Sequence, residues 1–121
     1  MLKNFIQLNY DEKLIILEWR NHSETSKFMI NKKVELKEHL NFINSLKENK
    51  TKLYFLVDDI GVIDFINITD KKADIGLYKN PNKQKVGSVL MKHIIDYGFN
   101  VLGLEKLILY VYENNQKAIN L

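Results

Sequence analysis

Residues 74–97 constrain the fold most, because a strand-like segment, a polar loop and a helical segment follow one another directly. Apolar and polar side chains alternate over residues 74–79, as they do in a strand, and Asn80-Pro81-Asn82 interrupts the pattern. Gly87 then stands at the entry of a segment whose apolar residues have helical spacing: Val86, Val89, Leu90, Ile94 and Tyr97. A helix start presents unpaired N–H groups and a partial positive charge, and a glycine there lets an anion approach the backbone. The stretch therefore predicts a phosphate-binding strand–loop–helix.

The composition indicates one folded domain and excludes several classes of function. The chain has 121 residues, of which 45% are apolar, and this suits a single globular domain spanning residues 1–121. Cysteine is absent, so we expect no disulfide framework, no cysteine nucleophile and no cysteine-based metal site, and we assign no residue to a metal. The N-terminus lacks a signal-peptide core, and no apolar run is long enough to cross a membrane. We therefore expect a cytoplasmic protein without a membrane partner.

Lysine supplies almost all of the positive charge. The chain has 18 Lys and Arg against 15 Asp and Glu, a net charge of +3, and the lysines often stand beside acids, as in Lys37-Glu38 and Lys47-Glu48. This mixture indicates a solvated surface and suits an anionic small ligand more than nucleic acid. Arg20 is the single arginine. Either it makes a forked, bidentate contact that lysine would not make, or it closes a helix.

The spacing of apolar residues predicts the remaining elements. In chain order we expect a strand at residues 4–8, helices at 10–20 and 35–48, strands at 52–57, 62–68 and 73–79, a helix at 86–100, a strand at 106–112 and a helix from Asn115. Short polar turns make the three central strands antiparallel, and the helix after them crosses over to a parallel strand. The predicted fold class is therefore α+β, a mixed sheet flanked by helices in the order β-α-α-β-β-β-α-β-α.

The segment Gln84-Lys85-Val86-Gly87-Ser88-Val89 resembles the acetyl-CoA signature of the GNAT superfamily of N-acetyltransferases, Gln/Arg-x-x-Gly-x-Gly/Ala. Gln84 and Gly87 fit this signature, whereas Val89 stands where the family has Gly or Ala. The expected element order is also that of the GNAT fold as far as residue 121. The resemblance implies a GNAT-type sheet whose C-terminal strands are missing.

This resemblance implies a site for acetyl-CoA, the acetyl donor of the family. There the fourth and fifth strands splay apart and the pantetheine arm enters between them as a surrogate strand; the matching residues are Leu77, Tyr78 and Lys79. The loop and helix that follow would hold the pyrophosphate, which implicates Gln84, Lys85, Val86, Gly87, Ser88 and Val89. Asn115-x-x-Ala118-x-x-Leu121 resembles a further family segment, so Asn115 would meet the pantetheine arm. The alternative role for Asn115 is a plain helix cap.

Several segments resemble, more narrowly, the acetyltransferases of bacterial pseudaminic acid synthesis: Glu18-Trp19-Arg20-Asn21-His22, Phe28-Met29, Glu38-His39-Leu40-x-Phe42-Ile43, Tyr54-Phe55-Leu56-Val57, Gly61-Val62-Ile63-Asp64-Phe65, Gly76-Leu77-Tyr78 and Glu113-Asn114-Asn115-x-Lys117-Ala118. This resemblance implies acetyl transfer to the 4-amino group of UDP-4-amino-4,6-dideoxy-N-acetyl-β-L-altrosamine, whose product serves flagellin glycosylation. The Trp-Arg-Asn part also occurs in acetyltransferases of ribosomal-protein N-termini, so acetylation of protein N-termini is the alternative. A basic nucleic-acid-binding module is a third possibility.

The narrower resemblance also suggests residues that bind this nucleotide-sugar acceptor. Arg20 and His39 suit contacts with phosphate and other polar groups. Met29, Phe42 and Tyr78 resemble the family's apolar wall for the 6-methyl group of the sugar. Ordinary core packing is the alternative for these three apolar side chains, and a solvated helix surface is the alternative for His39.

Two residues, Asp74 and Tyr78, are candidates for the chemistry, and Asp64 is a further acid in an unusual position. Asp74 fits the place where many GNAT members carry an acid that orders a base water, so it is the expected general base. The usual acid, a Tyr, would lie beyond Leu121, and Tyr78 is the substitute if its hydroxyl reaches the sulfur. Asp64 is a lone acid inside an apolar strand, and alternation would turn it to solvent.

The end of the chain carries an expectation of its own. The sequence stops about two turns into the helix expected from Asn115, which leaves one side of the strand at 106–112 unpaired. We therefore expect either a truncated chain or a homodimer in which a second copy completes the sheet. In either form we expect weakened acetyl-CoA binding and poor turnover, because the usual acid is absent.

Overall fold

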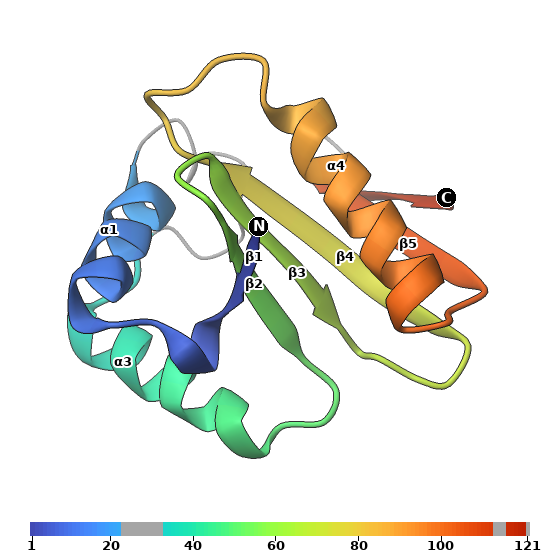
Figure 1. Ribbon diagram of the computed structural model, residues 1–121, viewed down its shortest axis with the longest axis horizontal. Helices are drawn as coiled ribbons and strands as arrows, with labels where there is room; N and C mark the ends of the chain where they lie inside the picture. The colour runs from blue at the N-terminus through green and yellow to red at the C-terminus, as the bar shows by residue number, and fades with distance from the viewer. Residues whose placement is uncertain (23–32, 113–115, 121) are drawn as a thin grey trace.

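A six-stranded mixed sheet forms the centre of the computed structural model, which describes residues 1–22, 33–112 and 116–120 (Figure 1). Its strands lie side by side in chain order: β1 (Leu2–Asn4), β2 (Leu53–Val57), β3 (Gly61–Ile66), β4 (Lys72–Lys79), β5 (Lys106–Tyr112) and β6 (Gln116–Asn120). Neighbouring strands are antiparallel except for β4 and β5, which are parallel. Short turns join β2 to β3 and β3 to β4, whereas a parallel neighbour requires the longer crossover through a helix.

Helices cover both faces of the sheet (Figure 1). One face carries these described elements: α1 (Tyr10–Asn21), α3 (Leu36–Ser45) and the 3₁₀ turns η1 (Phe5–Gln7) and η2 (Leu46–Glu48). The other face carries α4 (Gly87–Asp96), which continues into the π-helical turn η3 (Tyr97–Val101). Because successive side chains of a strand point to opposite faces, the central strands contribute alternate residues to two separate apolar layers.

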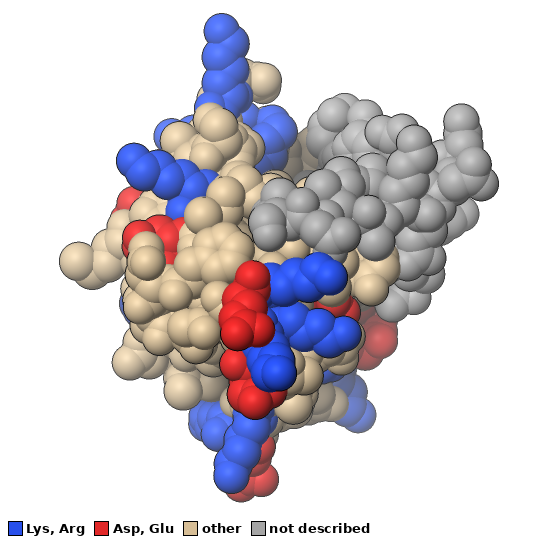
Figure 2. Space-filling model, turned by 90° about the vertical axis from the view of Figure 1, so that its right-hand side faces the viewer, with Lys and Arg blue, Asp and Glu red and all other residues tan. Residues whose placement is uncertain are grey.

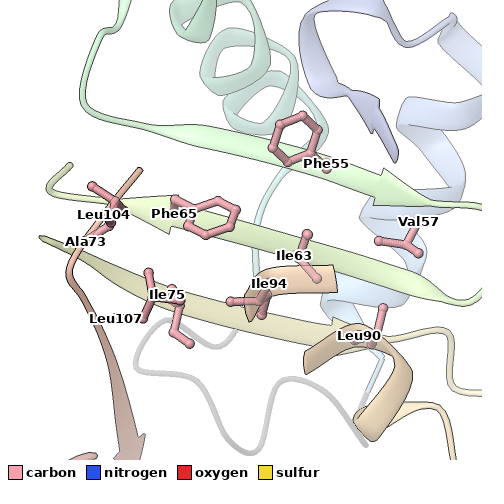
Figure 3. Packing of buried hydrophobic residues seen from close by; sticks show 10 residues of the cluster. All are labelled: Phe55, Val57, Ile63, Phe65, Ala73, Ile75, Leu90, Ile94, Leu104 and Leu107. Carbon is pink, nitrogen blue, oxygen red and sulfur yellow. The ribbon is translucent and has the colours of Figure 1, made fainter. Parts of the chain in front are cut away.

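The first apolar layer lies between α4 and the sheet (Figure 3). Leu90 and Ile94, one turn apart on α4, are fully buried in it. The other members are Phe55, Val57, Ile63, Phe65, Ala73, Ile75, Leu104 and Leu107. Gly98 lets η3 approach the sheet closely, since a Cβ at that position would lie 2.8 Å from a methyl group of Leu107. This packing fixes α4 over β3 and β4.

The second apolar layer lies between the sheet and the pair α1 and α3. Its buried members are Phe5, Leu8, Ile16, Trp19, Ile43, Leu46, Leu56 and Val62. A capping box starts α1: the Asn9 side chain accepts from the N–H of Glu12 at 2.8 Å, and the Glu12 carboxylate accepts from the N–H of Asn9 at 2.9 Å. The Lys3 ammonium of β1 donates to Glu12 at 2.8 Å. These contacts tie the start of α1 to the edge of the sheet.

The structure confirms most of the predicted elements. The helices expected at 10–20 and 35–48, the three central strands, the crossover helix and the parallel strand at 106–112 are all present, as is the α+β class. The strand expected at 4–8 is wrong in position, because β1 ends at Asn4. The Asn4 side chain accepts from the N–H of Ile6 at 3.1 Å and starts the turn η1.

The helix expected from Asn115 is wrong. Asn115 itself lies outside the described residues, but Gln116–Asn120 form strand β6, which pairs with β5 so that Gln116 is opposite Tyr112. A helix of about seven residues is marginal, whereas a strand here satisfies the backbone groups along the side of β5 that faces away from β4. In the described part of the chain, this pairing covers the open edge from which we inferred a homodimer.

Candidate active site

The parallel pairing between β4 and β5 ends halfway along β4. Register partners run from Lys72 and Lys106 to Ile75 and Leu109, and no further pair joins these two strands in the part of the chain that the structure describes. Among the described residues, residues 76–79 of β4 pair with β3 alone. Their opposite edge therefore offers backbone donors and acceptors to an extended ligand. The residues predicted to hold the pantetheine arm lie on this part of β4: Leu77, Tyr78 and Lys79.

The N-terminus of α4 follows β4 after a short loop. No side chain caps this helix, since Val86 occupies the cap position and makes no side-chain hydrogen bond to it. A Cβ built on Gly87 would meet no heavy atom within 4 Å, so the approach to the first turn is open. Unpaired N–H groups with a partial positive charge are what a phosphate group needs. Most of the residues predicted to line the pyrophosphate site are exposed here: Gln84, Lys85, Gly87, Ser88 and Val89.

Asn80 holds the loop between β4 and α4 against the β2–β3 turn. Its buried amide donates to the carbonyl of Asp59 at 2.9 Å, and its side-chain oxygen accepts from the N–H of Asn82 at 3.0 Å. The Lys79 ammonium donates to the carbonyl of Lys83 at 2.7 Å, and Lys83 forms an ion pair with Asp59 at 3.1 Å. These contacts fix the loop, so the approach to the first turn of α4 is preformed.

On the opposite face of the sheet, below α1 and α3, Asp64 of β3 lies over Gly76 of β4. The two residues are register partners, and a Cβ on Gly76 would lie only 2.8 Å from Oδ2 of Asp64. Burial raises the pKa of the Asp64 carboxyl to about 7. Part of the residue remains accessible, and no hydrogen bond from a described residue reaches the carboxylate. The expectation that Asp64 faces solvent is therefore wrong, because Gly76 leaves room for the carboxylate on the inner face.

Two tyrosines flank this carboxylate. Tyr54 is the register partner of Asp64 on β2, and Tyr78 comes from β4 on the other side. Burial raises the pKa of both phenols, and the negative charge of Asp64 raises it further. A phenol with a raised pKa holds its proton more firmly. Burial therefore opposes the role of proton donor that we predicted for Tyr78.

Arg20 and Phe42 belong to the same group of side chains as Asp64, Tyr54 and Tyr78, on the face of the sheet below α1 and α3. The positive charge of Arg20 counteracts the rise in the pKa of Tyr54 and Tyr78, which places its guanidinium near both phenols. The Phe42 ring packs edge-on against the ring of Tyr54, with centroids 4.9 Å apart. Three predicted acceptor residues, Arg20, Phe42 and Tyr78, thus gather on one face. Met29, which we also predicted to contact the sugar, lies outside the described residues.

His39 and Asp74 make other contacts. His39 is buried between α3 and α1, where its Nε2 lies 2.8 Å from the carbonyl oxygen of Lys13 and therefore donates to it. Burial lowers the pKa of this imidazole, so the ring is not the solvated side chain of the alternative interpretation. The Asp74 carboxylate accepts from the side-chain amide of Asn67 at 2.8 Å and belongs to the paired part of β4.

Asp64 and Tyr54 are the two members of this group that we did not select from the sequence. An acid between Ile63 and Phe65 interrupts an apolar strand, and that was the available signal. Whether this acid could lie on the inner face of the sheet depended on the residue opposite it. The pairing of β3 with β4 shows that this residue is Gly76. Cross-strand neighbours are not visible in a linear sequence until the register is known.

The charges, the helices and the His, Asp and Glu side chains of the described residues bear on three other kinds of binding: nucleic acid, membrane and metal. On the face displayed in Figure 2, acidic and basic side chains lie interspersed, which does not indicate a nucleic-acid surface there. Within the described ranges, no helix has the length and apolar character needed to cross a bilayer. The same residues contain no group of three His, Asp or Glu side chains placed to hold a metal ion.

Comparison with known proteins shows to which family the chain belongs. Residues 4–121 match the acetyltransferase (GNAT) domain. Two curated proteins of Campylobacter jejuni, both named acetyltransferase PseH, are 46% and 47% identical over 124 residues, which cover 99% of this chain and 79% of theirs. The protein therefore belongs to the GNAT acetyltransferase family, and it is a homologue of PseH.

Solved structures agree with this assignment. The crystal structure of C. jejuni N-acetyltransferase PseH in complex with acetyl coenzyme A is 39% identical and superposes with a TM-score of 0.76 over 95% of this chain and 78% of the other. The spermidine N-acetyltransferase of Vibrio cholerae, solved with CoA and spermine, has a TM-score of 0.80 over 92% of this chain and 70% of its own, at 21% identity. This second likeness concerns the fold alone.

Proposed function

We propose that the protein transfers an acetyl group from acetyl-CoA to the 4-amino group of a UDP-linked amino-dideoxy sugar, UDP-4-amino-4,6-dideoxy-N-acetyl-β-L-altrosamine. The observation that carries the proposal is the split between β4 and β5, which opens beside an uncapped helix N-terminus. The similarity to PseH, one structure of which holds acetyl coenzyme A, supports the donor and the sugar pathway. We place the reaction in the cytoplasm.

The donor site is the split together with the first turn of α4. Backbone groups of Leu77, Tyr78 and Lys79 would pair with the pantetheine arm as a neighbouring strand would. The N–H groups at the start of α4 would bind the pyrophosphate, because the helix presents them without a side-chain cap. Acetyl-CoA supplies an activated acetyl group as a thioester, and the chain's own task is to hold its two ends.

The acceptor site is the face below α1 and α3. Arg20 suits the diphosphate of a nucleotide sugar, because a guanidinium binds phosphate oxygens through two parallel hydrogen bonds. Phe42 and Tyr78 present apolar surface on the same face, which suits the 6-methyl group of a deoxy sugar. The lowered pKa of the His39 imidazole does not support an ionic contact with phosphate, so we assign the phosphate to Arg20.

Release of CoA from acetyl-CoA tests the function directly. Three acceptors are compared under the same conditions: the UDP-linked 4-amino sugar, peptides with free N-termini, and the same sugar acetylated in advance at the 4-amino group. We expect CoA release with the free amino sugar alone. Turnover with the peptides and none with the sugar would replace the proposal by acetylation of protein N-termini.

A variant at Gly87 tests the donor site. Gly87→Glu places a carboxylate at the first turn of α4, where it would repel the pyrophosphate, so we expect binding of acetyl-CoA to be lost in calorimetry. The matched control is Asp70→Glu, a change at an exposed turn position away from this helix that should leave binding unchanged. Undiminished binding by Gly87→Glu would show that the pyrophosphate lies elsewhere. Light scattering on the same samples measures the oligomeric state.

A further inference from the structure

The Asp64 carboxylate lies close to the split between β4 and β5. Pairing of the two strands ends at Ile75 and Leu109, so the split opens at Gly76. Gly76 is also the residue over which the Asp64 carboxylate lies, with 2.8 Å between Oδ2 and a Cβ built on the glycine. The carboxylate therefore lies at the point where the split begins, with no side chain of β4 at Gly76 to screen it.

The carboxylate is also available to a ligand. Asp64 is partly accessible, and within residues 1–22, 33–112 and 116–120 its oxygens accept no hydrogen bond. A carboxylate on the inner face of a sheet normally has a partner, because an unpaired buried charge is costly. Asp74, in contrast, already accepts a hydrogen bond from Asn67 at 2.8 Å. Of these two carboxylates, Asp64 is the one that accepts no hydrogen bond from the described residues.

Burial, and not the charge of a neighbouring group, keeps Asp64 near its point of half-ionisation at neutral pH. Tyr54 faces it from β2 and Tyr78 from β4, and burial keeps both phenols protonated. Arg20 lies on the side of α1, Asp74 lies further along the same face of β4, and His39 of α3 is turned toward Lys13. Burial alone accounts for the raised pKa of Asp64, about 7. A general base is most effective when its pKa lies near the working pH.

We propose that the Asp64 carboxylate binds the ammonium group of the acceptor across Gly76 and removes one proton from it, so that a neutral amine faces the thioester. The inference rests on the proposed function, because it presumes an amine acceptor. The amine nitrogen then forms a bond to the acetyl carbon while the carbon–sulfur bond breaks. The second proton of the nitrogen ends on the CoA sulfur, and the proton held by Asp64 passes to water.

The test compares pH profiles of isosteric variants with the wild type. Asp64→Asn keeps the size of the side chain but cannot take a proton, so we expect kcat/KM for the amino sugar at pH 7 to fall by about 10²–10³-fold. The dissociation constant for acetyl-CoA should stay unchanged. In the wild type we expect kcat/KM to fall as the pH drops below about 7, the pKa of this carboxyl. This acid limb should be absent from Asp64→Asn once the amine's own pKa, measured separately, is allowed for.

Two further variants sharpen the comparison. Asp74→Asn removes the competing candidate for the general base. Asp70→Asn, on the exposed β3–β4 turn, is the matched control for loss of a carboxylate. Loss of the acid limb in Asp74→Asn with its retention in Asp64→Asn would overturn the inference. So would a rate for Asp64→Asn within about threefold of the wild type, which is too small a loss for a general base.

A second readout does not depend on turnover. A carbon-13 NMR titration of the aspartate carboxyls in the wild type should show one group that titrates near 7, and that signal should be missing from Asp64→Asn. Titration of Asp64 at the ordinary value near 4 would overturn the inference even in an active enzyme. If the wild type releases no CoA with any amine, the proposed function fails and the inference with it. If the wild type is active and Asp64→Asn equally so, the inference alone fails.

Discussion

The imidazole of His39 in α3 donates to the backbone carbonyl of Lys13 in α1 over 2.8 Å, and this bond joins the two helices below the sheet. Burial lowers the pKa of His39 below its ordinary value of 6.5. The unfolded chain therefore binds a proton at this residue more readily than the folded protein does. Its contribution to stability is complete above pH 6.5 and is lost as the pH falls through and below that value.

Urea unfolding at pH 7.5 and pH 5.5 measures this effect. The raised pKa of Asp64 acts in the opposite direction, since the folded protein retains that proton more readily. The comparison must therefore be made against His39→Gln, which can still donate a hydrogen bond but does not titrate. We expect the wild type to lose more stability on acidification than His39→Gln does. Equal losses would show that His39 protonates without cost in the folded protein.

Gly76→Ala should destabilise the protein through contact with Asp64. The added methyl group would lie 2.8 Å from one carboxylate oxygen and 3.0 Å from the other, so we expect a loss of about 1–3 kcal/mol in the free energy of unfolding. Gly87→Ala is the matched control, because its methyl group would meet no atom within 4 Å. Combined with Asp64→Ala, the change at Gly76 should become nearly neutral. A large loss in that double variant would assign the effect to β4 itself.

Asn80→Ala should loosen the loop that leads into α4. The substitution removes the donor to the Asp59 carbonyl and the acceptor for the N–H of Asn82. We expect a loss of about 1–3 kcal/mol in denaturant unfolding and weaker binding of acetyl-CoA in calorimetry. Asn82→Ala is the control, because Asn82 is exposed and contributes its backbone N–H to this contact. Unchanged affinity in Asn80→Ala would mean that the loop forms without this anchor.

Arg20→Lys should affect the acceptor and not the donor. Lysine keeps the positive charge but loses the planar fork that binds two phosphate oxygens, so we expect the Michaelis constant for the sugar nucleotide to rise about tenfold. The Michaelis constant for acetyl-CoA should change little, because the donor site lies at the split and at the start of α4. If neither constant changes, Arg20 serves to close α1.

Local sequence patterns were sufficient for most of the fold. The apolar spacing in α1, α3 and α4 and the alternation in β3 and β4 reflect burial against one sheet, which is the same information that the folded core uses. The strand–loop–helix around Gly87 was also readable, because its function depends on backbone groups and a missing side chain. The two errors, at η1 and β6, arose where an element is short and a side-chain turn or a neighbouring strand decides between helix and strand.

The candidate site was less predictable than the fold. Arg20, Phe42 and Tyr78 were selected by resemblance, and the structure brings them to one face. His39 was selected for its chemistry, yet its partner is a backbone carbonyl 26 residues away in the sequence. Asp64 depends on a glycine in another strand. Such relationships depend on register and on helix placement, which no local pattern encodes.

The join between β4 and β5 also has a consequence for local unfolding. Within the described residues, the pairs from Lys72–Lys106 to Ile75–Leu109 and the adjoining bonds to the Lys71 carbonyl link the antiparallel strands β1–β4 to β5 and β6. Amide hydrogen exchange should therefore be faster in β5 than in β3, which is paired on both sides along most of its length. A ligand lying in the split would bridge the two parts and slow exchange in β5. Saturation with acetyl-CoA should then turn two regions of unequal protection into a single cooperative unit.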